Sequence, residues 1–161
     1  AVSGPLAALL RDILKAGLNI YVMHTNFDHA KGGINDSLAS LLDFSGIYRM
    51  SLGICGDCPL EIPELSKRLA APIISWGRPP LPCRLGVVGG GGFEPALIAE
   101  AAEHGAEAFL SADLKHAVAR ASPLPLLQTT HYALEAPGMR RLAESMGWQF
   151  IDDPPVMATW R

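Results

Sequence analysis

The sequence predicts an α/β fold with mixed, mainly parallel sheets and flanking helices, and three observations lead to this prediction. Apolar segments of strand length alternate with segments whose apolar residues recur at helical spacing. Glycine and proline fall between these segments, as they do between elements of regular structure. Hydrophobic residues make up 49% of the 161 residues and charged residues 18%, which is typical of a chain with a buried core rather than of a disordered one.

The elements expected in the first half follow from this periodicity. Leucine and isoleucine repeat at helical spacing between Pro5 and Ala16, and Gly17 ends that helix. The apolar run Asn19–Met23 is typical of a buried strand. The further elements of this half are a helix at 35–44, a strand at 46–54 and a helix at 62–71.

The proline-rich segment 76–83 is typical of a linker and divides the chain into two small α/β lobes, at 1–75 and 84–161. In the second lobe, Pro95 favours a helix start and Gly105 a helix end. The elements expected there are strands at 84–88, 107–110, 124–128 and 148–151, with helices at 94–104, 113–119 and 137–146.

Charge and composition exclude several classes of partner. The net charge is −3, so the chain lacks the basic footprint that nucleic acid or an anionic lipid surface requires. Its apolar runs are too short to span a bilayer, and charges interrupt the helical pattern of residues 1–18, which is unlike a signal peptide. Three cysteines form no disulfide framework. We therefore expect a cytoplasmic protein that binds neither nucleic acid nor membrane.

Two pairs of a histidine and a carboxylate, each four residues apart, are the strongest chemical signal. His24 and Asp28 follow the expected strand 19–23, and His131 and Glu135 follow the apolar segment 124–127. Open α/β sheets place their chemistry at the ends of strands. Imidazole and carboxylate together suit a hard or borderline divalent metal ion.

Each pair also has a structural alternative. Asp28 can be a turn residue or a helix cap, and His24 can be a buried histidine bonded to backbone. His131 and Glu135 can be an exposed pair that contributes little to stability. Pro137 would interrupt a helix, so we expect the main helix to begin near it and residues 131–135 to form a single turn or a loop.

Three further motifs are less specific. Gly89–Gly92 lies between a strand and a helix, so it is a tight turn or a phosphate site. Cys55 and Cys58 form a Cys-x-x-Cys without enough further ligands for zinc, and we interpret them as loop cysteines. Asp113 and His116 belong to a polar cluster in which Asp113 can cap a helix or line a pocket.

Four ordered blocks of sequence resemble the Nif-three-like family, whose members are also labelled GTP cyclohydrolase I type 2. The first block runs from His24-Thr25-Asn26-Phe27-Asp28 through Gly32-Gly33-Ile34-Asn35-Asp36 to Leu42, and the others lie at 89–93, 106–116 and 130–139. The four blocks occur in the family's order and together extend over nearly the whole chain. The resemblance is therefore far more specific than any single motif.

The resemblance implies a Nif-three-like fold with two divalent ions (zinc, iron or manganese) held between the two lobes. It implies Asp28, His131 and Glu135 as metal ligands, with Glu135 bridging the ions. His24 and His116 could move protons, since histidine titrates near neutrality. The family also implies a homo-oligomer, a ring-shaped hexamer whose sites face an internal cavity.

Two functions fit the resemblance. The first is a metal-dependent hydrolase acting on a nucleotide or phosphorylated small molecule, with the glycine turn and Lys115 able to meet a phosphate. The second is a non-catalytic metal-binding regulatory or interaction protein. The sequence names neither the substrate nor the metal.

The sequence departs from the family pattern at two places. The family's remaining ligands, an adjacent His-His pair, do not occur here, so we expect an N-terminally truncated fold and an incomplete metal site. Many members carry a second histidine where this chain has Ala117 after His116, which weakens a catalytic role for that segment.

Overall fold

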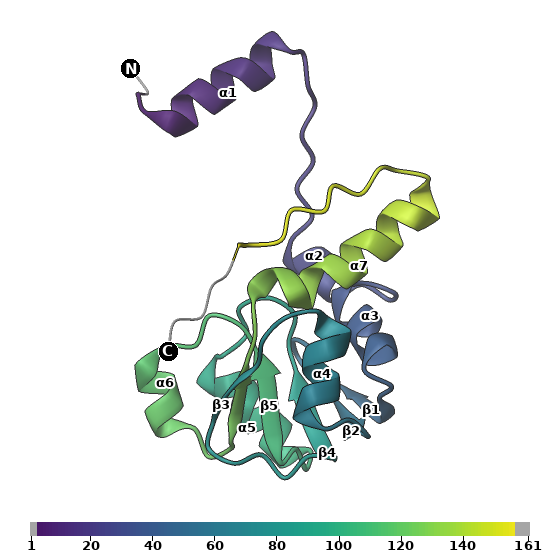
Figure 1. Cartoon of the computed structure of the whole chain (residues 1–161), viewed down its shortest axis with the longest axis vertical. Helices are drawn as coiled ribbons and strands as arrows, with labels where there is room; N and C mark the ends of the chain where they lie inside the picture. The colour runs from purple at the N-terminus through teal and green to yellow at the C-terminus, as the bar shows by residue number, and fades with distance from the viewer. Residues whose placement is uncertain (1–2, 157–161) are drawn as a thin grey trace.

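Six strands form one mixed sheet in the computed structural model, which describes residues 3–156 (Figure 1). The strands lie in the order β1-β2-β4-β5-β6-β3. β4, β5 and β6 run parallel at the centre, β1 and β2 are antiparallel on one side, and β3 is antiparallel on the other. The strands are β1 (Ser45–Arg49), β2 (Ile54–Cys58), β3 (Ile74–Trp76), β4 (Cys83–Val87), β5 (Ala108–Ser111) and β6 (Leu126–Gln128).

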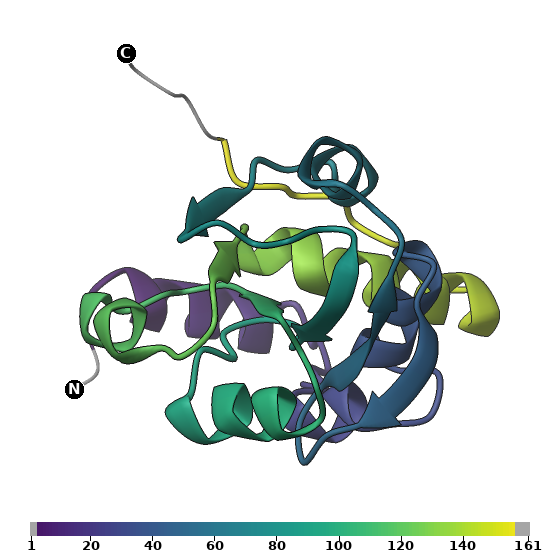
Figure 2. The same ribbon diagram turned by 90° about the horizontal axis from the view of Figure 1, so that it is seen from below.

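Helices cover both faces of this sheet because successive strand residues point to opposite sides. On β5, Leu110 packs with α3, α4 and α7, whereas Phe109 packs against α5 on the other face. Figure 2 shows α4 and α5 on opposite sides of the strands. The helices are α1 (Pro5–Lys15), α2 (Thr25–Asp28), α3 (Ile34–Leu41), α4 (Ile62–Leu69), α5 (Pro95–Glu103), α6 (His116–Ala121) and α7 (His131–Met146).

The structure confirms the predicted α/β class with a mixed sheet and flanking helices. The β4–β5 and β5–β6 pairings are parallel, and the other three pairings of the sheet are antiparallel. The segments expected as separate lobes both contribute strands to this sheet. β2 from the first segment pairs with β4 from the second along its whole length, from Ile54–Val87 to Cys58–Cys83. The proline-rich segment 76–83 therefore connects two strands of the same sheet.

Two predicted strands do not form. Residues 19–23 and 148–151 carry no strand, and Ile20, Val22 and Ile151 are exposed. A strand needs a partner for its backbone groups, and within residues 3–156 neither segment is paired with one. The helix predicted at Pro5 forms as α1, but it projects from the body with its apolar side chains Leu6 and Leu14 exposed (Figure 1).

The strand predicted at 46–54 ends at Arg49, so that the predicted range holds most of β1, a turn, and only Ile54 of β2. Met50 N–H donates to the carbonyl of Gly53 at 3.1 Å, and Gly53 has a φ of +92°. A Cβ at Gly53 would lie 2.4 Å from the carbonyl oxygen of Val87. The chain therefore reverses where only glycine fits, which an apolar pattern alone does not reveal.

The main C-terminal helix begins at His131, so the prediction that it starts near Pro137 is wrong. The hydroxyl of Thr130 accepts a hydrogen bond from Ala133 N–H at 3.1 Å, which fixes the helix start well before the proline. Pro137 lies inside α7, and Gly147 ends it with a φ of +66°.

No helix within residues 3–156 combines the length and the apolar character that a membrane span needs.

The close contact of α7 with α3 gives a test of this packing. A Cβ at Gly138 would lie 2.7 Å from Ile34 Cδ1 and 3.0 Å from Ile34 Cα. Gly138→Ala should therefore lower the free energy of unfolding by about 1–3 kcal/mol, although alanine favours a helix by about 1 kcal/mol over glycine. Denaturant unfolding measures the change. Glu144→Ala, exposed on the same helix, is the control and should stay within about 0.5 kcal/mol of wild type. A Gly138→Ala protein as stable as wild type would contradict the packing.

Candidate functional site

His131 and Glu135 lie side by side on the first turns of α7. Their Nε2 and Oε1 atoms are 3.0 Å apart, as expected for residues four apart on one helix face. On its other side, Nδ1 of His131 lies 2.6 Å from Oδ2 of Asp113. The imidazole is therefore held between two carboxylates.

The glycine loop after β4 closes over this group. A Cβ at Gly90, which has a φ of +70°, would lie 2.7 Å from Glu135 Oε1 and 2.9 Å from His131 Nε2. A Cβ at Gly91 would lie 3.0 Å from Asp113 Oδ2. The loop approaches the polar side chains this closely only because it has no side chains of its own.

A buried hydroxyl fixes the shape of the loop. Ser111, at the end of β5, is 0% exposed, and its Oγ accepts a hydrogen bond from Gly92 N–H at 2.7 Å. Its proton faces the carbonyls of Gly90, at 2.9 Å, and Val88, at 3.0 Å. Because every polar contact of this hydroxyl is with the loop, Ser111 is a local support for it.

Asp28, the last residue of α2, faces the same region. Partial burial raises the pKa of its carboxyl, and the negative charge of Glu135 raises it further. His24, His29 and His131 act on that pKa in the opposite direction. These influences fall off with distance, so the structure brings Asp28 into electrostatic range of both members of the α7 pair.

Asn35 joins the Asp28 segment to the glycine loop. Its Nδ2 donates to the carbonyl of Asp28 at 2.9 Å, and its Oδ1 accepts from Gly89 N–H at 2.9 Å. The side chain is only 3% exposed. Asn35 therefore links two segments that are far apart in the sequence and sets how α2 meets the loop.

The predicted proton carriers lie in different places. His24 is the N-cap residue of α2, is exposed, and its Nδ1 lies 3.0 Å from the hydroxyl of Thr25. His116 begins α6 and is also exposed. Within residues 3–156, His116 makes no hydrogen bond or ion pair with His131 or Glu135. His24 therefore lies near Asp28, whereas His116 does not contact His131 or Glu135.

Asp113 is the site residue that the sequence interpretation undervalued. The helix-cap explanation is wrong, because Lys115 is the N-cap residue of α6 and no side chain caps that helix. Asp113 instead has a φ of +59° and reaches across to α7. Its place directly after a buried strand was the only signal, and many ordinary turn residues share it.

These residues fit a divalent metal ion in part. The donors of Asp28, His131 and Glu135 suit zinc, iron or manganese, and the Gly90 cradle leaves the facing Nε2 and Oε1 atoms unobstructed by a side chain. In the described part of the chain, however, no three His, Cys, Asp or Glu side chains converge closely enough to hold an ion. Within the described residues, the group therefore does not form a complete coordination sphere.

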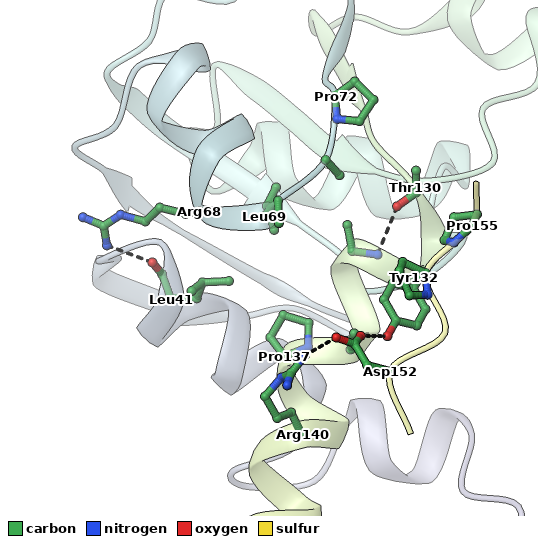
Figure 3. A pocket seen from close by; sticks show the side chains of 15 residues that line it. Leu41, Arg68, Leu69, Pro72, Thr130, Tyr132, Pro137, Arg140, Asp152 and Pro155 are labelled. Carbon is green, nitrogen blue, oxygen red and sulfur yellow. Dashed lines mark hydrogen bonds and ion pairs between the residues drawn. The ribbon is translucent and has the colours of Figure 1, made fainter. Parts of the chain in front are cut away.

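A separate cavity of about 630 Å³ lies beside α7 and α4 (Figure 3). It is lined by apolar side chains together with five polar or charged ones, Arg68, Thr130, Tyr132, Arg140 and Asp152. The polar atoms of Tyr132 and Arg140 bond to Asp152. None of the predicted site residues lines it. The cavity and the predicted metal ligands are therefore distinct features.

A family model described as Duf34/NIF3 (NGG1p interacting factor 3) matches residues 1–156. The chain belongs to the Duf34/NIF3 family. The resemblance seen in the four sequence blocks is thereby confirmed.

Individual relatives of the Duf34/NIF3 chain agree with this assignment. A Streptomyces coelicolor protein named GTP cyclohydrolase 1 type 2 homolog is 32% identical over 153 residues, covering 80% of this chain and 53% of the relative. Reduced HcgD from Methanocaldococcus jannaschii has a TM-score of 0.77 at 25% identity, covering 90% of this chain and 63% of HcgD. The protein ybgI, of unknown function, has a TM-score of 0.81 at 25% identity, covering 96% of this chain and 70% of ybgI. The chain thus spans about half the length of the Streptomyces relative.

The cysteines lie in strands rather than in a loop, which corrects the sequence interpretation. Cys55 and Cys58 are in β2, Cys83 is in β4 opposite Cys58, and all three are buried and free. Burial raises the pKa of each thiol, for Cys83 to about 12. A redox or metal role needs an accessible thiolate, which this environment disfavours.

The buried thiols predict slow alkylation. At pH 8 the native protein should react with iodoacetamide at least about tenfold more slowly than the protein in urea, because the reactive thiolate is scarce and shielded. Mass spectrometry of labelled peptides measures the rate at each cysteine. Labelling of native Cys83 as fast as in urea would contradict the raised pKa.

Asn35 provides a test of how the site is anchored. Asn35→Ala leaves Gly89 N–H and the carbonyl of Asp28 without their partner, so the free energy of unfolding should fall by about 1–3 kcal/mol. Ser40→Ala, exposed on the same helix, is the matched control and should change little. Denaturant titration compares the two, and equal stability of both variants would rule out an anchoring role.

Proposed function

We propose that this Duf34/NIF3 chain contributes ligands to a divalent-metal centre, with Asp28, His131 and Glu135 binding two ions of zinc, iron or manganese. The observation that supports this most is the facing pair on α7, His131 Nε2 and Glu135 Oε1, 3.0 Å apart beneath a loop without side chains. Groups outside this set, such as water or other polypeptide, would complete the coordination.

The electrostatics of the group favour a cation. Burial raises the pKa of the Asp28 carboxyl, and the negative charge of Glu135 raises it further. Asp113 brings a third carboxylate to the same histidine. A positive ion would relieve this repulsion, which is why carboxylate clusters of this kind suit metals.

We further propose that the centre serves a metal-dependent hydrolase acting on a nucleotide or phosphorylated small molecule. Curated relatives carry the name GTP cyclohydrolase 1 type 2 homolog, which supports this class. Two bound ions would activate a water and stabilise negative charge on the substrate. In this proposal His24, exposed near Asp28, would carry a proton, and His116 would need to approach from α6.

A non-catalytic metal-binding regulator is the second candidate. The exposed apolar side chains of α1 and of residues 18–22 favour it, because such surfaces mark interaction sites. We propose homo-oligomeric assembly as a hexamer and a cytoplasmic location with either function.

Metal binding tests the centre directly. Calorimetric titration with zinc or manganese should show that His131→Ala and Glu135→Gln weaken binding by at least about tenfold, since each removes a ligand. Glu144→Gln is the control, because it is exposed on the same helix outside the site. Wild-type affinity in both ligand variants would refute the assignment.

Turnover separates the two candidate functions. A screen of nucleoside triphosphates and phosphate esters with zinc, iron or manganese should give hydrolysis that Glu135→Gln lowers by at least about a hundredfold while the variant stays folded. Hydrolysis unchanged by Glu135→Gln would contradict the hydrolase. Metal binding without turnover on any substrate would favour the regulator.

A further inference from the structure

We propose that Asp113 is a positioning residue for His131. It accepts the proton on Nδ1 and so leaves Nε2 as the nitrogen that faces Glu135 and a metal ion. This inference rests on the proposed metal function. It adds a residue that the resemblance does not include among the ligands.

The two nitrogens of the His131 ring lie at different distances from their carboxylate neighbours. Asp113 Oδ2 is 2.6 Å from Nδ1, whereas Glu135 Oε1 is 3.0 Å from Nε2. An ionised carboxylate only accepts hydrogen bonds, so the contact with Asp113 needs a proton on Nδ1 and the contact with Glu135 needs one on Nε2. A neutral imidazole carries only one of these protons. We place it on Nδ1, at the shorter contact, which leaves the lone pair on Nε2, the nitrogen beneath the Gly90 cradle.

The sheet sets the position of Asp113 relative to His131. Asp113 follows β5 and His131 follows β6, and the two strands are parallel neighbours whose ends lie at one edge. Thr129 N–H donates to the carbonyl of Ser111 at 3.1 Å, which ties the strand ends together just before both side chains. The contact is therefore built on rigid elements.

The surroundings of Asp113 are adapted to its carboxylate. Its φ of +59° is a conformation that Asp and Asn tolerate better than most residues. Ala112 N–H donates to the carbonyl of Gly90 at 2.9 Å, which holds the strained residue next to the loop. Gly91 leaves room for Oδ2, since a Cβ there would lie 3.0 Å away.

Stability alone does not account for this contact. The side chains of Asp113 and His131 are 64% and 48% exposed, and exposed ion pairs contribute little to folding. Asp113 also does not cap α6. Carboxylates that orient metal-binding histidines, by contrast, commonly change metal affinity by about 10–100-fold.

Two substitutions remove the carboxylate without straining the backbone. Asp113→Gly and Asp113→Asn both tolerate a positive φ, so either protein should fold. Asn can still accept from Nδ1 through its amide oxygen, which makes it the conservative variant. Glu103→Gln, exposed on α5, is the control for loss of one negative charge.

Nitrogen-15 NMR of the histidine rings, in metal-free protein at a pH where His131 is neutral, reads the tautomer. Wild type should hold the proton on Nδ1, Asp113→Gly should shift it toward Nε2, and Asp113→Asn should stay nearer to wild type. Calorimetry with zinc should show about 10–100-fold weaker binding for Asp113→Gly and a smaller loss for Asp113→Asn. Glu103→Gln should match wild type in both measurements.

The outcomes separate this inference from the proposed function. An unchanged tautomer in Asp113→Gly overturns the inference, and so does a changed tautomer with wild-type zinc affinity. If wild type itself binds no zinc, the metal proposal fails, while a tautomer shift still establishes that Asp113 orients His131. Gly91→Ala, which crowds Oδ2 but keeps the carboxylate, should shift the tautomer in the same direction and decides the matter if Asp113→Gly does not fold.

Discussion

The parallel pairing of β4, β5 and β6 is the constraint on which the rest of the structure depends. Each of these strands ends at the same edge of the sheet, so the loops after them meet there. The first loop is Gly89–Gly92, the second carries Asp113, and the third leads into α7 with His131 and Glu135. Residues distant in sequence become neighbours because their loops all follow the carboxyl ends of adjacent parallel strands. Asp28 joins them through a different element, and the amide of Asn35 supplies that link.

Two buried polar side chains, those of Ser111 and Asn35, fix how these loops lie relative to one another. The hydroxyl of Ser111 bonds to the glycine loop and to the carbonyl of Val88 just before it. The side chain of Asn35 bonds to that loop and to the Asp28 segment. Buried polar groups cost stability unless every bond is made, so a satisfied pair of this kind specifies one arrangement of the loops rather than a family of them. Glycine is required at position 90, because a side chain there would collide with His131 and Glu135.

The sequence predicted the central elements well, because their apolar residues repeat with a period that the sheet and helices impose. His131 and Glu135 share a face of α7, as residues four apart on a helix must, whereas the sequence predicted only a single turn or a loop there. The prediction failed where contact with another segment of the chain decides the local structure. Residues 19–23 have the pattern of a strand, yet a strand forms only beside another, and no such neighbour lies within residues 3–156. Asp113 could not be predicted for a related reason: its role comes from a contact across the sheet edge, and the local sequence is that of an ordinary turn.

The carboxylates near His131 contribute little to stability, which supports a functional role for them. Asp113 and Glu135 each contact the imidazole of His131, and Asp28 lies in electrostatic range of Glu135 and His131. Exposed ion pairs such as the two contacts of His131 contribute little to folding. At Asp28 the balance is unfavourable to charge, since burial and Glu135 together outweigh the nearby histidines. A fold selected for stability alone would gain by replacing such residues, because removing like charges removes their repulsion. Under the proposed metal function, a positive ion between the oxygens would turn this repulsion into attraction, which would account for these residues at the edge where the loops meet.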